Sequence, residues 1–373
     1  MRILHVAESA QGGVGTYLAE ILPDQARRFG VDNVRAVVPD RHAAHLSGVD
    51  RRLITVWPRP DRSAAGAARL ALAVQREVAR FAPTVVHAHS SIAGAVVRGL
   101  YGWRPRRFRI VYCPHGWAFD RRSSAPKKHA IELVERGLAS AADRIVVISE
   151  HEQREAIRIG IAPERLSLVL NGIADQPTAR PARWDDERLK LLFVGRLDEQ
   201  KGFDTLIDAV EPLKDRVALR VIGKAIAGPA TRRRTDRAQV EYLGWRSLAE
   251  VAAEIAAADL IAIPSRWEGF GLVALEAMRE GRAVVASAVG GLREIVVDGE
   301  TGRLVPPDAP ERLMRAIAGH SRNEWRAMGA AGRLRFERLF TASRMNDALA
   351  QLYHELSPPS APIPVRAAER AHA

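Results

Sequence analysis

Residues 264–276 read Pro-Ser-Arg-Trp-Glu-Gly-Phe-Gly-Leu-Val-Ala-Leu-Glu, and this stretch decides how the rest of the chain is interpreted. The run before it, residues 259–263, is mostly apolar and predicts a buried strand. Apolar residues recur at helical spacing over residues 272–279. A strand therefore ends, a glycine-rich loop turns and a helix begins. In sheets of parallel strands, such junctions lie at the edge where ligands bind.

Two glutamates of this stretch can approach one ligand. Glu268 lies in the loop, and Glu276 lies about one turn inside the helix. The amides of Phe270, Gly271 and Leu272 are unpaired at the helix N-terminus, which favours an anion. Two carboxylates beside an anion site predict a ligand with hydroxyls and phosphate, such as a nucleotide sugar. A glycosidase is the alternative, with its two carboxylates about 5.5 Å apart for retention.

Apolar runs alternate with helical patterns along most of the chain. In the first half, strands are expected at residues 3–7, 34–38, 53–57, 84–89, 109–113 and 144–148. After a proline-containing segment near residues 172–186, strands are expected at residues 189–194, 219–222, 240–243, 260–263 and 283–286. Strands alternating with helices indicate parallel sheets covered on both faces. We therefore expect an α/β protein with two Rossmann-like domains that face each other across a cleft.

The composition is that of a globular protein with enough residues for two cores. The chain has 373 residues, of which 47% are hydrophobic and 27% are charged. The single cysteine, Cys113, excludes an internal disulfide and favours a reducing, cytoplasmic compartment. The N-terminal apolar run is too short for a signal peptide, and no uncharged run approaches the ~18 residues of a membrane span.

The net charge of +12 lies mostly in the first half of the chain. Residues 1–175 carry 26 Lys and Arg residues against 17 Asp and Glu residues. Nucleic acid is not expected as a partner, because no basic stripe is interleaved with aromatic residues. An anionic membrane surface and a solvated cationic rim remain as alternatives. The cluster concerned is Tyr101, Trp103, Arg104, Arg106, Arg107, Arg109, Trp117, Phe119, Arg121, Arg122, Lys127 and Lys128.

A basic turn follows the first expected strand of the second half. Residues 195–202 read Gly-Arg-Leu-Asp-Glu-Gln-Lys-Gly, and a helical pattern begins directly after them. Arg196 and Lys201 beside a helix N-terminus indicate a phosphate clamp, although a solvated charged loop has the same appearance. A hydrolase would not need this clamp. Transfer from an activated donor is therefore favoured over hydrolysis.

Two features of the first half are weaker signals. Gly12, Gly13 and Gly15 follow the first strand, where they either leave helix amides free for a ligand or form a tight structural turn. His115 follows the strand at residues 109–113, which places it at the cleft. A loop histidine that caps a neighbouring group is equally compatible with this position.

His87 and His89 lie on one face of an expected strand, where they resemble metal ligands. No third ligand accompanies them at a suitable spacing, so a metal site is not expected. Support of the Ser90–Ser91 loop or binding of the acceptor is the preferred interpretation.

Taken together, these motifs resemble the retaining, GT-B-fold glycosyltransferases of family 4. The resemblance covers about residues 1–340. Its most specific parts are Glu-x7-Glu at Glu268 and Glu276, Gly-Arg-Leu-x3-Lys-Gly at residues 195–202, and Gly-Gly-Leu-Arg-Glu-Ile at residues 290–295. The His-Ala-His-Ser-Ser and Pro-His-Gly-Trp-Ala-Phe segments look most like members that build bacterial exopolysaccharide, capsule or lipopolysaccharide.

The resemblance implies a role for each residue of the site. Arg196 and Lys201 would hold the donor diphosphate and stabilise it as it leaves, so no metal and no other cofactor is expected. Glu276 would accept hydrogen bonds from the ribose. Glu268 would bind sugar hydroxyls, and His115 would contact the transferred sugar near the reacting carbon. The backbone that binds the donor would come from Gly12, Gly13, Gly15, Phe270, Gly271 and Leu272.

The resemblance also assigns the domains. Residues 1–172 would form the acceptor domain and residues 173–340 the nucleotide-sugar donor domain. A helix over residues 341–356 would return to the N-terminal domain. The tail, residues 357–373, contains four prolines and is expected to be disordered.

The implied reaction is transfer of a hexose from a nucleotide sugar to an oligosaccharide or lipid-linked acceptor, with retention, in cell-surface polysaccharide synthesis. A nucleotide-sugar epimerase or hydrolase on the same fold is the alternative. The donor base, the sugar and the acceptor are left open by the sequence.

Overall fold

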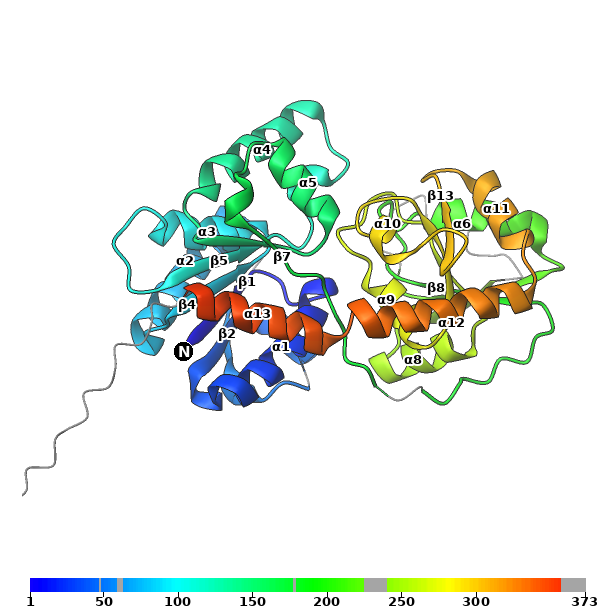
Figure 1. Cartoon of the computed structure of the whole chain (residues 1–373), viewed down its shortest axis with the longest axis horizontal. Coiled ribbons are helices and arrows are strands. Elements are labelled where there is room, and N and C mark those ends of the chain that lie inside the picture. The colour runs from blue at the N-terminus through cyan, green and yellow to red at the C-terminus, as the bar shows by residue number, and fades with distance from the viewer. Residues whose placement is uncertain (47, 59–62, 177–178, 225–239, 357–373) are drawn as a thin grey trace, which may run out of the picture.

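The computed structural model describes residues 1–46, 48–58, 63–176, 179–224 and 240–356. These residues form two α/β lobes, each built around one parallel sheet (Figure 1). The proline-containing tail, residues 357–373, lies outside the described residues.

The N-terminal lobe contains a seven-stranded sheet in the order β3-β2-β1-β4-β5-β6-β7. Every residue of the central strands β1 and β4 is buried, as expected for parallel strands that are covered on both faces. The strands are β1 (Ile3–Ala7), β2 (Val34–Pro39), β3 (Ile54–Trp57), β4 (Val85–His89), β5 (Arg109–Cys113), β6 (Arg144–Val147) and β7 (Leu166–Leu168). The helices are α1 (Gly13–Phe29), α2 (Ala64–Phe81), α3 (Ser91–Tyr101), α4 (Ala125–Ala139) and α5 (Glu150–Arg158).

The C-terminal lobe contains a six-stranded sheet in the order β10-β9-β8-β11-β12-β13. Its strands are β8 (Leu189–Val194), β9 (Val217–Ile222), β10 (Val240–Gly244), β11 (Leu260–Ile263), β12 (Ala283–Ser287) and β13 (Gly302–Val305). Its helices are α6 (Phe203–Val210), α8 (Leu248–Ala257), α9 (Leu272–Arg279), α10 (Leu292–Ile295), α11 (Pro310–Ala318) and α12 (Arg322–Leu339). The expectation of two Rossmann-like domains is confirmed.

The strand order of each sheet reverses between two neighbouring strands. The reversal lies between β1 and β4 in the first sheet and between β8 and β11 in the second. Ligands of doubly wound sheets bind beyond the carboxyl ends of the strands at these points. The segments that follow β1, β4 and β5 and those that follow β8 and β11 are therefore the positions from which a site can be built.

The chain crosses between the lobes twice, and the two crossings lie side by side. The amide of Ile173 donates to the carbonyl oxygen of Phe340 at 3.1 Å, and the amide of Ala342 donates to that of Ile173 at 2.8 Å. A Cβ atom added at Gly172 would lie only 2.3 Å from the carbonyl oxygen of Thr341. This close approach is possible only for glycine.

After the second crossing, helix α13 (Ala342–Leu356) lies on the N-terminal lobe beside α1 (Figure 1). Its side chains Leu349, Leu352 and Tyr353 are buried in the same hydrophobic cluster as Ile21 of α1. The expectation that the C-terminal helix returns to the N-terminal domain is confirmed.

The sequence patterns did not predict the edge strands β7 and β13. These strands have three and four residues, which is too few for a periodic pattern to be recognised. They complete the outer edges of the two sheets and do not contribute to the cleft.

Replacing Leu349 by Ala should lower the free energy of unfolding by about 3 kcal/mol, because it leaves a cavity between α13 and the N-terminal core. Urea denaturation followed by circular dichroism measures this change. Arg344→Ala, on the exposed face of the same helix, is the control and should change stability by less than about 0.5 kcal/mol. Equal effects of the two substitutions would contradict anchoring through the buried face.

Candidate active site

Two glycine-containing loops meet between the lobes. One follows β5 and carries His115 and Gly116, and the other follows β11 and carries Glu268 and Gly269. A Cβ atom added at Gly269 would lie 3.0 Å from the Cα of Gly116 and 3.4 Å from the carbonyl oxygen of His115. The backbones of the two loops therefore touch. This contact brings together His115 and Glu268, which are 153 positions apart in the chain.

The loop that carries His115 is held in place by Glu152 of α5. The carboxylate of Glu152 accepts the amide of Gly116 at 2.5 Å and the amide of Ile148 at 3.0 Å. Burial raises the pKa of Glu152 to about 8, although both amide bonds favour its charged form. His115 itself has a φ of +52°, a left-handed conformation that residues other than glycine rarely adopt. The conformation of this loop is therefore held by its hydrogen bond to Glu152.

Glu268 forms an ion pair with Lys201. The Nζ atom of Lys201 lies 2.5 Å from Oε2 of Glu268, and the hydroxyl of Ser265 donates to the same oxygen at 3.3 Å. Lys201 follows β8 and Glu268 follows β11, two strands that are neighbours in the sheet. The side chains keep 20% and 13% of their surface exposed. A ligand in the cleft can therefore reach both of them.

Arg196 lies further out on the same turn. Its Nε atom is 2.9 Å from the carboxylate of Asp198, and its Nη2 atom donates to the side-chain oxygen of Gln200 at 2.7 Å. Asp198 also accepts the amide of Lys201 at 3.1 Å. Half of the Arg196 side chain is exposed. The two cations of the expected phosphate clamp thus come from one turn. Lys201 is paired with Glu268, and Arg196 lies further out, at the exposed rim of the turn.

The loop of Glu268 leads into α9, whose N-cap, Gly271, has a φ of +112°. The glycine pair of the Gly-Gly-Leu-Arg-Glu-Ile motif packs directly beneath this loop. A Cβ atom at Gly290 would lie 1.7 Å from the carbonyl oxygen of Glu268, and one at Gly291 would lie 2.9 Å from that of Gly269. This pair therefore lets two backbones pack closely.

The first glycine loop faces α9 from the other lobe. A Cβ atom at Gly13 would lie 3.8 Å from the Cδ1 atom of Leu272, whereas Gly12, with a φ of +59°, has open space on its Cβ side. Gly15 does not face the other lobe. A Cβ atom there would lie 2.4 Å from the carbonyl oxygen of Ala10 in the same loop. Gly12 and Gly13 thus border the cleft, and Gly15 packs within its own loop.

Sequence reasoning missed a contact between the lobes that is made by Glu294. Its carboxylate accepts the amide of Glu150 at 2.7 Å and the amide of His151 at 2.6 Å. These amides open α5, and a carboxylate is favourable at a helix N-terminus. Glu294 belongs to the Gly-Gly-Leu-Arg-Glu-Ile motif, but no local pattern indicates that its partner lies in the other lobe.

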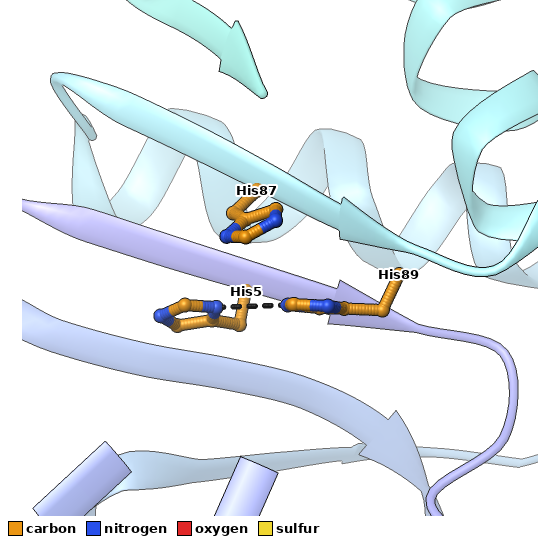
Figure 2. Close-up of side chains that lie close together, drawn as sticks. All are labelled: His5, His87 and His89. Atoms are coloured by element: carbon orange, nitrogen blue, oxygen red, sulfur yellow. Dashed lines mark hydrogen bonds between the residues drawn. The ribbon is translucent and has the colours of Figure 1, made fainter. Parts of the chain in front are cut away.

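A buried group of histidines behind His115 was also missed. The sequence showed no third ligand for His87 and His89, but His5 of β1 provides one (Figure 2). The strands pair so that His5 lies opposite His87, and ring nitrogens of the three residues lie within 4.8 Å of one another. Nε2 of His115 lies 2.9 Å from Nδ1 of His89. The only sequence signal for His5 is its place in the neighbouring buried strand.

Two family models match the chain along these two lobes. One is described as a glycosyl transferase 4-like domain and matches residues 12–172. The other is described as glycosyl transferases group 1 and matches residues 188–323. Together the two matches cover most of the chain, which belongs to the glycosyl transferases. The resemblance inferred from the sequence motifs is confirmed, and the protein is an enzyme of the glycosyltransferase class.

Two relatives show which proteins are similar in sequence to this glycosyltransferase. An uncharacterised 41.2 kDa protein in the cps region of Klebsiella pneumoniae is 27% identical over 365 residues, which cover 95% of this chain and 99% of the relative. The D-inositol 3-phosphate glycosyltransferase of Corynebacterium glutamicum is 33% identical over 267 residues. That second match covers 63% of each chain.

Solved structures place this glycosyltransferase in the GT-B fold. Sucrose-phosphate synthase from Thermosynechococcus elongatus superposes with a TM-score of 0.82 at 22% identity, covering 95% of this chain and 99% of the other. HepE from Anabaena, in complex with UDP-glucose, superposes with a TM-score of 0.77 at 21% identity, covering 95% and 100%. At this level of identity the likeness concerns the fold, and it confirms the expected fold class.

Glu276 of the glycosyltransferase lies in the second turn of α9, where its side chain is half-buried. Burial raises the pKa of Glu276 to about 7, with Arg279 acting in the opposite direction and Glu20 adding to the rise. Glu20 belongs to α1 of the other lobe, and burial raises its pKa as well. Carboxylates from both lobes therefore lie near each other and near Arg279, whose charge opposes but does not outweigh the effect of burial on their pKa values.

Replacing Glu276 by Gln should stabilise the enzyme more at pH 8 than at pH 5. The folded state holds the proton of Glu276 up to about pH 7, whereas the unfolded chain releases it near pH 4.5, so this residue lowers stability as the pH rises between these values. The difference between variant and wild type should grow by about 2 kcal/mol over this range. Urea denaturation at both pH values measures it.

The control for this prediction is Glu311→Gln, which removes an exposed carboxylate at the start of α11. Its effect on stability should differ little between the two pH values. A constant difference between Glu276→Gln and wild type from pH 5 to pH 8 would contradict the raised pKa.

Proposed function

We propose that this enzyme is a retaining hexosyltransferase that moves a sugar from a nucleotide-sugar donor to a glycan or lipid-linked acceptor in cell-surface polysaccharide synthesis. The observation that carries the proposal is the Lys201–Glu268 ion pair at the start of α9, opposite His115. The UDP-glucose complex of the similarly folded HepE supports the class of donor. The relative in the cps region supports the class of product.

In this proposal, the donor diphosphate binds between the basic turn and the N-terminus of α9. Lys201 turns from Glu268 towards the phosphate, and Arg196 reaches it from the rim, where half of its side chain is exposed. The unpaired amides of Phe270, Gly271 and Leu272 add partial positive charge. Fixed charges of this kind commonly contribute ~10²–10³ each in rate. In the proposal, these charges stabilise the leaving diphosphate, and no metal ion is included.

The carboxylates and His115 hold the rest of the donor. Glu276 accepts hydrogen bonds from the ribose hydroxyls, and its charged form, the better acceptor, becomes dominant above about pH 7. Glu268 accepts from sugar hydroxyls once Lys201 has moved to the phosphate. Burial lowers the pKa of His115 to about 3, so its ring is neutral and can accept a sugar hydroxyl. Gly12 and Gly13 let the donor approach the backbone of the first lobe.

The proposed reaction proceeds with retention. The acceptor hydroxyl attacks the anomeric carbon on the face from which the diphosphate leaves. The bond from this carbon to the phosphate oxygen breaks, the bond to the acceptor oxygen forms, and the hydroxyl proton passes to the leaving phosphate oxygen. The engagement of Glu268 with Lys201 and Ser265 supports a role in binding for this carboxylate, and not one as a covalent nucleophile.

Lys201→Ala and Glu276→Ala should each reduce turnover about 100-fold or more, because both remove a group that holds the donor. The donor is first identified by thermal shift with UDP, GDP, ADP and their sugars, and transfer to a glycan acceptor is then followed by mass spectrometry. Lys214→Ala, an exposed lysine on the far side of the same lobe, is the matched control.

Full activity of both variants would overturn the assignment of the donor site. Product formed from the donor without any acceptor would instead favour epimerisation or hydrolysis. The anomeric configuration of the product, read by NMR, tests retention separately.

The structure corrects the composition of the cationic cluster that is proposed to meet a membrane. Trp117 and Phe119 are 1% and 0% exposed and belong to the core. Arg106 and Arg109 both bind the carboxylate of Asp143, at 2.6 and 3.2 Å. Trp117 and Phe119 therefore do not belong to an exposed surface, and the charges of Arg106 and Arg109 are partly balanced by Asp143.

A smaller patch remains for the proposed contact with anionic lipid. Trp103 is 63% exposed, and its neighbours Arg104 and Arg107 are exposed as well. Indole rings and arginines are groups that favour the surface of an anionic membrane. Nowhere in the described ranges does a helix have the length and apolar character of a membrane span. The proposed contact is therefore a peripheral one.

Charge reversal of Arg104 and Arg107 to Glu should weaken binding to phosphatidylglycerol vesicles by tenfold or more, because each basic group contributes about 1 kcal/mol at such a surface. Co-sedimentation at low and high salt measures the binding, with phosphatidylcholine vesicles as reference. The double variant Lys214→Glu/Arg312→Glu carries the same net charge change in the other lobe and serves as control. Sedimentation of the wild type with neither type of vesicle would contradict the proposal.

A further inference from the structure

A continuous chain of side chains leads from the cleft into the core of the N-terminal lobe. It begins with the 2.9 Å contact between Nε2 of His115 and Nδ1 of His89. Nε2 of His89 lies 3.0 Å from Nδ1 of His5 (Figure 2), and Nε2 of His5 lies 2.7 Å from the side-chain oxygen of Gln25. His5 and His89 are fully buried and Gln25 is 3% exposed. The inner end of the chain is therefore closed to water.

The amide oxygen of Gln25 sets the direction of every hydrogen bond in this chain. A carbonyl oxygen only accepts, so His5 carries its proton on Nε2. Burial lowers the pKa of His5 to about 4, and it also lowers those of His89 and His115, so each ring holds a single proton at neutral pH. Nδ1 of His5 then accepts from Nε2–H of His89. In the same way, Nδ1 of His89 accepts from Nε2–H of His115.

We propose that Gln25, His5 and His89 are positioning residues that fix the tautomer of His115. In this tautomer, Nε2 carries the proton and donates into the core, and Nδ1 keeps a lone pair. That lone pair accepts a hydroxyl hydrogen of the transferred sugar. The inference rests on the proposed function for the nature of the ligand, whereas the direction of the chain depends only on Gln25.

The geometry around His115 fits a fixed ring. Tyr17 of α1 meets it edge-on, with the ring centroids 4.7 Å apart and the planes at 73°. The hydrogen bond to His89 holds Nε2 of the imidazole, and Tyr17 also contacts the ring of His89, with the centroids 5.6 Å apart. Both the position of the ring and the nitrogen that carries its proton are thus determined by buried groups.

The same arrangement argues against a proton wire. A wire must release its proton to a group or solvent at the far end, but Gln25 cannot be protonated in this range and is buried. A proton that entered at Nδ1 of His115 would leave the chain with an extra buried charge, which is unfavourable in a dry core. The chain therefore keeps a tautomer in place and does not conduct protons.

A three-histidine metal site is the competing interpretation of His5, His87 and His89. Nδ1 of His87 lies 2.7 Å from the hydroxyl of Tyr353, and its Nε2 has no hydrogen-bond partner among the described residues. An ion bound by Nδ1 of His5 and Nε2 of His89 would displace the hydrogen bond between these atoms and require His89 to carry its proton on Nδ1, which faces Nε2 of His115. No carboxylate or thiolate belongs to this described group to offset a buried dication. The hydrogen-bonded chain is therefore favoured.

The test is the tautomer itself, read from long-range proton–nitrogen NMR spectra of the full-length protein labelled with ¹⁵N-histidine. Signals are assigned with the single variants His5→Gln, His89→Gln and His115→Gln. We expect His5, His89 and His115 all to carry their proton on Nε2 in the wild type. A proton on Nδ1 of His115, which a reversed Gln25 amide would produce, would overturn the proposal, as would stoichiometric zinc in elemental analysis of the purified protein.

Two substitutions of Gln25 separate its acceptor from its volume. Gln25→Met keeps the size of the side chain but removes the oxygen, so part of the His115 signal should change to the Nδ1–H form. Gln25→Glu keeps an acceptor and should retain the wild-type tautomer. His87→Asn is the matched control, because it alters the same buried cluster outside the chain. Unchanged tautomers in Gln25→Met, or an equal change in His87→Asn, would overturn the proposal.

Turnover gives the functional readout. Gln25→Met should lower kcat about tenfold through loss of one well-oriented hydrogen bond to the sugar, and Gln25→Glu should restore most of it. Wild-type kcat in Gln25→Met, despite a changed tautomer, would overturn the link to the sugar. A wild-type protein with the expected tautomers but no transferase activity would instead refute the proposed function and leave the histidine chain standing.

Discussion

The close approach of two backbones is the constraint on which the site depends. Gly116 of one lobe and Gly269 of the other are in contact, and a Cβ atom at Gly269 would lie only 3.0 Å from the Cα of Gly116, so one of the loops would have to shift. Gly290 packs beneath Glu268 in the same way. Because these contacts involve main chain, the neighbouring side chains, His115 and Glu268, take no part in them.

The exclusion of water at this junction determines the charge state of the groups around it. Burial raises the pKa of Glu276 to about 7 and that of Glu152 to about 8, and it lowers that of His115 to about 3. Each shift favours the neutral form of the side chain. The Lys201–Glu268 pair, which stays partly exposed, remains a pair of opposite charges. The glycosyltransferase therefore combines side chains that are held neutral, from both lobes, with the partly exposed basic turn of the C-terminal lobe.

Most of the fold and the first contacts of the site could be predicted from short patterns. The glycine-rich turns that follow apolar strands predicted the positions of Gly12, Lys201 and Glu268. The carboxyl ends of parallel strands all lie at the same edge of a sheet, so these turns do as well. Glu294 and His5 escaped prediction, since their partners lie 144 and 84 positions away in sequence. Neither the register between strands nor a contact between the lobes produces a periodic pattern of hydrophobic residues that can be recognised in a single sequence.

By itself, the sequence determined the alternation of strands and helices, the two-lobed α/β architecture and the residue types at the strand ends. These depend on local hydrophobicity, on turn chemistry and on the free amides of helix N-termini. Only the tertiary structure decided that His115 is joined through His89 and His5 to Gln25. It also decided that Trp117 and Phe119 are core residues. Both depend on which surfaces are removed from water, and this is settled only when distant segments pack together.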